Sequence, residues 1–69
     1  MAQVFLRHAF ALGHCRSGVR DYLAAHDIPF GTVAGPDAPG LDSATLRAFG
    51  DRFGAEIAAF AEAEEARRG

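Results

Sequence analysis

The clearest periodic pattern in the chain is an apolar stripe in its C-terminal part. The repeating positions, at spacings of three and four residues, are Leu46, Phe49, Phe53, Ile57 and Phe60. This spacing places the five side chains on one face of an α-helix. Asp42 or Ser43 can cap its first turn. We therefore expect one continuous helix over residues 42–67, with the stripe facing the core.

Two glycines lie beside this stripe and offer an alternative. Each of them, Gly50 and Gly54, costs about 1 kcal/mol relative to alanine in a helix interior. A break near Gly50, with Asp51 capping a new helix, would avoid part of that cost. If the helix is unbroken, the missing side chains would let another backbone approach closely.

The first residues of the chain also show a helical pattern. On one side of a helix over residues 4–12 we expect Phe5, Leu6, Ala9, Phe10 and Leu12. Arg7 and Ala11 would lie on the opposite, solvent-facing side. A short strand over Gln3–Arg7 is the alternative, because Val, Phe and Leu also favour strands.

A second short helix is expected after Gly13, which interrupts the first pattern. Ser17 can cap it, and we expect it to reach about His26. The apolar positions that would face the core, spaced i, i+3, i+4 and i+7, are Val19, Tyr22, Leu23 and His26. Pro29 stops the helix, since the residue before proline avoids helical conformation.

Residues 29–40 contain three prolines and three glycines, a composition typical of loops with turns. Phe30 and Val33 are expected to anchor this loop to the core. The sequence therefore predicts an all-α fold in one domain, residues 1–69. It would consist of two short N-terminal helices, a Pro/Gly loop and one long C-terminal helix. A break of this last helix near Gly50 is the alternative.

Composition limits the function classes. The 69 residues include 34 apolar ones, of which 15 are alanine. A chain of this size buries only about 60% of its unfolded surface, so self-association or a partner is a route to stability. Such a chain rarely holds a preorganised pocket as well as a core. We expect a non-enzymatic binding protein without cofactors.

The metal-ligating residue types give no close pair. They are His8, His14, Cys15 and His26, with neither a Cys-x-x-Cys nor a His-x-x-x-His spacing. Structural zinc sites usually contain such pairs, and no metal site is predicted. We expect Cys15 to be a small buried side chain and His26 to lie at a helix end.

Charge is distributed unevenly, although the formal net charge is only -2. The first 20 residues carry three arginines and no acid, whereas residues 36–69 carry four arginines and seven acids. Ala9, Gly13 and Val19 also have the spacing of a helix-turn-helix motif, whose second helix enters the DNA major groove. Under this hypothesis the nucleic-acid-binding candidates are Arg7, Arg16 and Arg20.

Protein binding is the other function class that the residues favour. The candidate partner-binding residues are Arg16 and Arg20 at one end and Asp51, Glu56 and Glu62 at the other. Complementary charge on a partner would steer association. A small-residue face would permit close helix pairing in a homodimer, and it consists of Ala48, Ala55, Ala59 and Ala66.

The sequence contains no run of the roughly 20 apolar residues that a membrane span needs. Arg7 and His8 interrupt the apolar start, which is unlike a secretory signal. We expect a cytoplasmic protein without membrane contact.

With Gly13, Cys15, Gly18 and Arg20 at their spacing, the segment 7–28 resembles a family of small phage and prophage proteins. Their pattern Arg-x-x-x-Gly-x-Cys-x-x-Gly-x-Arg is matched here at Gly13, Cys15, Gly18 and Arg20. An Ala-Thr-Gly-Asp segment of the family resembles residues 48–51, with Phe49 in place of threonine. The central loop is longer and richer in proline and glycine than in the family.

The resemblance implies an origin in a mobile element of a GC-rich bacterium. Small phage proteins include anti-CRISPR inhibitors, which bind a CRISPR-Cas complex and cover a surface of it. The prediction from the resemblance is therefore an inhibitor whose partner is a host protein or ribonucleoprotein complex. A helix-turn-helix-like DNA-binding protein and a virion assembly factor are the alternatives.

Overall fold

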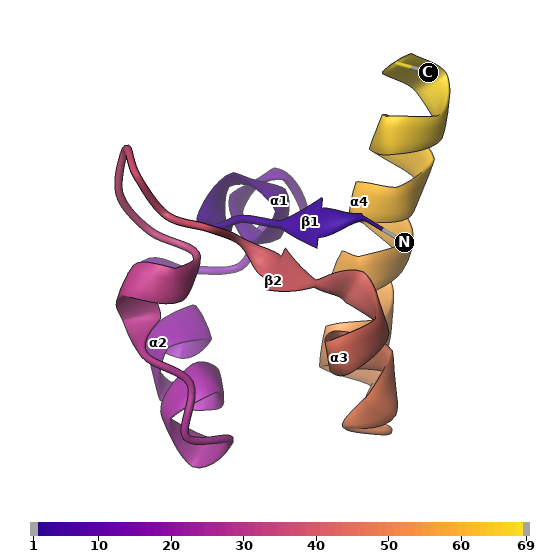
Figure 1. Ribbon diagram of the computed structural model, residues 1–69. Helices are drawn as coiled ribbons and strands as arrows, with labels where there is room; N and C mark the ends of the chain where they lie inside the picture. The colour runs from indigo at the N-terminus through magenta and orange to yellow at the C-terminus, as the bar shows by residue number, and fades with distance from the viewer. Residues whose placement is uncertain (1, 69) are drawn as a thin grey trace.

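The computed structural model describes residues 2–68 (Figure 1). In chain order, the elements are β1 (Gln3–Val4), α1 (Leu6–Ala11), α2 (Arg16–Ala25), a 3₁₀ turn η1 (Phe30–Thr32), β2 (Leu41–Asp42), α3 (Ser43–Ala48) and α4 (Arg52–Arg68). The expectation of a mostly helical domain is confirmed. The expectation of an all-α fold is wrong in one respect, because β1 and β2 form a small antiparallel sheet.

The sheet joins the start of the chain to the segment that enters α3. Val4 pairs with Leu41, and the Ala2 N–H donates to Ser43 Oγ at 3.0 Å. The Ser43 N–H donates back to the Ala2 carbonyl at 2.9 Å. The first helix consequently begins at Leu6 rather than at residue 4. Of the alternative strand expected over Gln3–Arg7, only the two residues of β1 form a strand.

The long C-terminal helix is broken, so the expectation of one helix over residues 42–67 is wrong. Gly50 adopts φ +79°, in the left-handed region that glycine enters without steric cost. Asp51 then starts α4, with its Oδ1 accepting the Gly54 N–H at 2.7 Å. Asp42 caps α3 by accepting the Ala44 N–H at 3.0 Å. The alternative of a break at Gly50 is therefore confirmed.

The apolar stripe faces inward as expected, although α3, the linker and α4 share it. Leu46 and Ile57 are buried, and Phe49 and Phe53 pack half-buried against the core. Phe60 is half-buried as well, with its ring 6.0 Å from that of His8. The α3–α4 pair therefore presents one continuous apolar face to the rest of the chain.

The core combines this face with residues from β1, α1, α2 and the central loop. Its buried hydrophobic members are Ala2, Val4, Ala9, Val19, Leu23, Val33, Leu46, Ile57, Ala58 and Ala61. Val33 and the partly buried Phe30 anchor the central loop, as expected. Two positions of the first helix differ from expectation, since Phe10 and Leu12 are 47% and 40% exposed. Within residues 2–68, no helix is both long and apolar enough to cross a bilayer.

Candidate nucleic-acid interface

The α1–turn–α2 unit contains the residues for which the sequence predicts helix-turn-helix spacing. Four residues, 12–15, separate the two helices, and Gly13 within this turn adopts φ +90°. Ala9 and Val19 lie on the inner sides of the two helices, at 2% and 5% exposure. Figure 1 shows α1 nearly end-on and α2 running up the page, so the two helices cross. A small buried residue, a turn glycine and a buried β-branched residue thus lie at the three positions of the spacing described in the sequence analysis, and a short turn that contains glycine is common between the helices of such a motif.

Cys15 supplies the N-cap of α2. Its Sγ accepts the Gly18 N–H at 3.3 Å and lies 3.5 Å from the Ser17 hydroxyl. The Ser17 hydroxyl and then the Gly18 N–H lower the pKa of the thiol below its usual value. Two expectations are therefore wrong: Cys15 is exposed rather than buried, and Ser17 lies inside the first turn rather than capping it. A cysteine with extended backbone can accept the cap hydrogen bond through its thiol. The expected cap was Ser17 because serine is a preferred residue at this position.

The exposed side of α2 carries both of its arginines. The exposed residues of this helix are Arg16, Ser17, Gly18, Arg20, Asp21, Ala24 and Ala25. Val19 and Leu23 occupy the opposite, buried face. The Arg16 guanidinium lies over the Phe30 ring, 5.2 Å from its centroid, an arrangement that leaves its N–H groups available. Within residues 2–68, no carboxylate pairs with Arg16 or Arg20.

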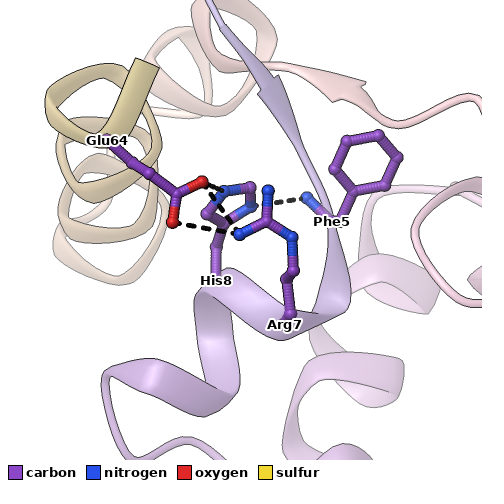
Figure 2. Close-up of polar contacts among 4 residues, drawn as sticks. All are labelled: Phe5, Arg7, His8 and Glu64. Atoms are coloured by element: carbon purple, nitrogen blue, oxygen red, sulfur yellow. Dashed lines mark hydrogen bonds and ion pairs between the residues drawn. The ribbon is translucent and has the colours of Figure 1, made fainter. Parts of the chain in front are cut away.

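A buried histidine fixes α1 against α4 (Figure 2). His8 is 2% exposed, and its Nδ1 accepts the Phe5 N–H at 2.9 Å. Its Nε2 lies 3.2 Å from Glu64 Oε1. Because Nδ1 accepts a hydrogen bond, the partners assign the ring hydrogen to Nε2, which donates to Glu64. Both ring nitrogens are satisfied, as a buried polar side chain requires.

Arg7 takes part in the same contact between α1 and α4 and is not a free basic side chain. Its Nη1 lies 2.8 and 3.0 Å from the two carboxylate oxygens of Glu64. Arg7 and then His8 hold the pKa of Glu64 below its ordinary value. Of the three nucleic-acid-binding candidates, Arg7 is thus engaged with α4, while Arg16 and Arg20 share α2.

A second group of polar contacts holds α2 against the start of α4. The Tyr22 hydroxyl lies within 3.0 Å of both Asp51 oxygens, and His26 Nε2 lies 3.9 Å from Oδ2. The Gly54 N–H, followed by the Tyr22 hydroxyl, lowers the pKa of Asp51. Burial and the neighbouring carboxylate raise the pKa of Tyr22. The His26 ring stacks on Phe49 at 3.8 Å, so His26 lies at the helix end as expected.

The five predicted partner-binding residues do not gather on one surface. Arg16 and Arg20 lie on α2, whereas Glu56 and Glu62 lie on α4 and Asp51 precedes it. Glu62 binds Arg47 of α3 at 2.6 Å, and Glu56 binds Arg52 at 3.0 Å. The Arg47 guanidinium lowers the pKa of Glu62 to about 2. The three acids are therefore used in contacts within the chain.

The predicted small-residue face is divided by the helix break. Ala48 ends α3, while Ala55, Ala59 and Ala66 lie on α4. Ala55 is half-buried and the other three are exposed. Because two helices with different axes carry these residues, they do not form one stripe for close helix pairing.

Sequence reasoning missed the most connected side chains of the site. His8, Glu64 and Tyr22 join elements that are far apart in the chain, and no local spacing signals such pairs. Ser17 and Asp21 could have been found, since they share the outer face of α2 with the two arginines at helical spacing. Within residues 2–68, no group of three or more His, Cys, Asp or Glu side chains is placed to hold a metal ion.

Comparison with known proteins adds no assignment. No family model matches the chain, and neither does a curated protein or a solved structure.

Proposed function

We propose that this protein binds duplex DNA and places α2 in the major groove. One observation carries the proposal: Ala9 and Val19 are buried on either side of Gly13, whose φ is +90°, while α2 exposes two arginines that have no carboxylate partner among residues 2–68. In helix-turn-helix proteins the second helix docks in the major groove with its N-terminal residues at the base edges. The DNA would be that of the bacterial cytoplasm.

The distribution of charge leaves the arginines of α2 able to attract DNA phosphates, although the net charge of the chain is -2. Arg47, Arg52 and Arg7 lie against Glu62, Glu56 and Glu64, so that the acids around α4 are largely compensated within the chain. The arginines of α2 have no such partners among the described residues. Arg67 and Arg68 at the end of α4 are likewise exposed and without a carboxylate partner among the described residues, so the charge of α2 adds to the helix-turn-helix geometry but does not single this helix out.

The outer face of α2 also offers groups that distinguish bases. Arginine can bind guanine O6 and N7 with two hydrogen bonds. Asp21 can accept from the cytosine amino group, and the Ala24 methyl can contact that of thymine. Arg16, held over Phe30, is better placed to contact phosphate. We assign base readout to Arg20, Ser17 and Asp21.

The test is selection from a random duplex library, followed by fluorescence anisotropy on the enriched sequence across a salt series. Arg20→Ala should weaken binding and relax the preference at one base position, by about 1–3 kcal/mol of discrimination. Arg16→Ala should weaken binding uniformly and reduce the slope of log affinity against log salt by about 1.

Arg67→Ala is the matched control. Arg67 is also exposed, but it lies in the last turn of α4, at the opposite side of the molecule from α2 (Figure 1). This variant should bind like the wild type. Absence of any duplex binding at low salt, or an equal effect of Arg67→Ala and Arg20→Ala, contradicts the proposal.

Inhibition of a CRISPR-Cas complex stays a prediction from the resemblance, as does virion assembly. Capture of a host complex by the wild type, lost on charge reversal at Arg16 and Arg20, would favour inhibition. That result together with no duplex binding would replace the DNA proposal.

A further inference from the structure

His8 is a buried titratable side chain that lies where separate parts of the fold meet. Its ring is 2% exposed. Figure 2 shows this ring between the backbone nitrogen of Phe5, which links β1 to α1, and the carboxylate of Glu64 on α4. The Phe60 ring of α4 packs edge-on against it, with the two centroids 6.0 Å apart. A proton gained by His8 therefore changes contacts that hold several elements together.

The start of α1 is held by two reciprocal hydrogen bonds between Phe5 and His8. The Phe5 N–H donates to His8 Nδ1 at 2.9 Å, and the His8 N–H donates to the Phe5 carbonyl at 3.0 Å. In the usual form of this capping box, a glutamate or glutamine side chain accepts from the N-cap backbone. Here an imidazole nitrogen takes that place. The difference matters because histidine gains a proton between about pH 8 and pH 5, above the ordinary range of carboxyl groups.

Protonation has different effects at the two ring nitrogens. An imidazolium ion carries a hydrogen on each nitrogen and can only donate. At Nε2 the added charge faces Glu64 Oε1, 3.2 Å away, so the contact with α4 is kept. At Nδ1 the new hydrogen faces the Phe5 N–H, so two donors meet and the amide loses its acceptor. Arg7 contacts the same Glu64 carboxylate and is itself a donor, so it does not replace Nδ1 as the acceptor.

The Phe5 side chain extends this consequence to the end of the central loop. A Cβ at Gly40 would lie 2.9 Å from Phe5 Cζ, so the ring packs directly against the backbone there. Gly40 adopts φ +85°, and its N–H donates to the Thr32 carbonyl at 2.8 Å. A displacement of Phe5 would therefore loosen the packing of the segment that enters β2.

We propose that His8 is a pH-sensitive switch whose protonation releases the Phe5 N–H and opens the first turn of α1, while the contact with Glu64 persists. The opening also loosens the packing of the Phe5 ring on the central loop. Protonation of His26 would act in the opposite direction, because it adds an attraction to Asp51, 3.9 Å away. The switch does not rest on DNA binding, and its test uses the free protein.

Nuclear magnetic resonance of the isotope-labelled protein tests the switch. The ring signals of His8 report protonation of Nδ1, and hydrogen exchange reports the protection of the Phe5 amide, both between about pH 8 and pH 5. After correction for the intrinsic pH dependence of exchange, protection of Phe5 should fall about tenfold, in step with protonation of Nδ1, because one hydrogen bond is lost. A ring that stays neutral over this range overturns the proposal, as does one that gains its proton while the Phe5 amide stays protected.

His8→Asn separates the proton from the hydrogen bond. The asparagine oxygen lies at nearly the same position as Nδ1, accepts a hydrogen bond and does not titrate. The Phe5 amide should therefore keep its protection over the whole pH range. An equal pH response of Phe5 in this variant and in the wild type contradicts the proposal.

His14→Gln is the matched control, because it removes a half-buried histidine that takes no part in the contact between Phe5 and His8. It should lose protection at Phe5 as the wild type does, and a Phe5 amide that stays protected in this variant would assign the response to His14. Should His8→Asn fail to fold, the wild type and His14→Gln still decide, since the ring signals identify which histidine gains the proton.

Discussion

The Tyr22 hydroxyl lies 3.0 and 2.9 Å from Oδ1 and Oδ2 of Asp51 and thereby ties α2 to the residue that starts α4. Tyr22→Phe removes this contact while keeping the ring that packs 4.5 Å from Phe53. We expect a loss of about 1 kcal/mol in the free energy of unfolding, the usual contribution of one hydrogen bond. Urea unfolding measures it, and an unchanged midpoint would show that this contact is dispensable.

Acidification should destabilise the fold through its paired carboxylates. The pKa values of Asp51, Glu62 and Glu64 are lowered in the folded state, that of Glu62 to about 2 from an ordinary 4.5. A lowered folded pKa gives stability that is complete above the unfolded pKa and is lost as pH falls through the folded one. For Glu62 the loss should therefore extend from about pH 4.5 down to about pH 2.

The measurement is Tm against pH for the wild type and Glu62→Gln. Glutamine cannot titrate, so the variant should be less stable at neutral pH and show a shallower fall below pH 4.5. Identical slopes in the two proteins would mean that Glu62 does not contribute to the acid dependence.

A side chain at Gly54 should not fit. A Cβ there would lie 2.6 Å from the Tyr22 hydroxyl oxygen and 2.9 Å from the Leu46 carbonyl oxygen. Gly54→Ala should cost about 1–3 kcal/mol, the usual range for overpacking, and separate α2 and α3 from α4. Gly31→Ala is the matched control, because nothing lies within 4 Å of its Cβ and its φ is not positive. Thermal unfolding of the two variants should differ clearly.

His8 should matter more for stability than the ion pair beside it. His8→Ala removes a buried ring and leaves the Phe5 N–H without its acceptor, for an expected loss of about 3 kcal/mol. Glu64→Gln keeps an oxygen that can accept from His8 Nε2 and loses only the charge facing the half-exposed Arg7, so its effect should be much smaller. A larger loss in Glu64→Gln than in His8→Ala, measured by urea unfolding, would reverse this ranking.

Local sequence signals predicted much of the fold. The spacing from Leu46 to Phe60 gave the inward face of α3 and α4, and the left-handed preference of glycine made the Gly50 break a foreseeable alternative. The small sheet was harder to foresee, because β1 and β2 have two residues each and form only through pairing with each other. Two residues show no alternation that a pattern could detect.

The candidate site was only half predictable. Arg16 and Arg20 were identified from their places on one short helix and are exposed there. Arg7 has the same charge, but its partner Glu64 lies 57 positions away, and only the tertiary fold brings them together. Phe10 and Leu12 follow the helical pattern and still face solvent, since α1 has only six residues and nothing among the described residues covers its far side.

Two groups of polar contacts hold the α1–α2 pair against α4. Tyr22 of α2 contacts Asp51, which caps α4, and His8 of α1 contacts Glu64. Each residue of an α-helix advances about 100° around the axis. Inserting or deleting one residue between these two points would turn Glu64 away from His8 while Asp51 kept its contact with Tyr22. The helical phase of α4 therefore fixes the number of residues between Asp51 and Glu64, and natural variation in chain length is expected to fall in the loop 34–39 instead.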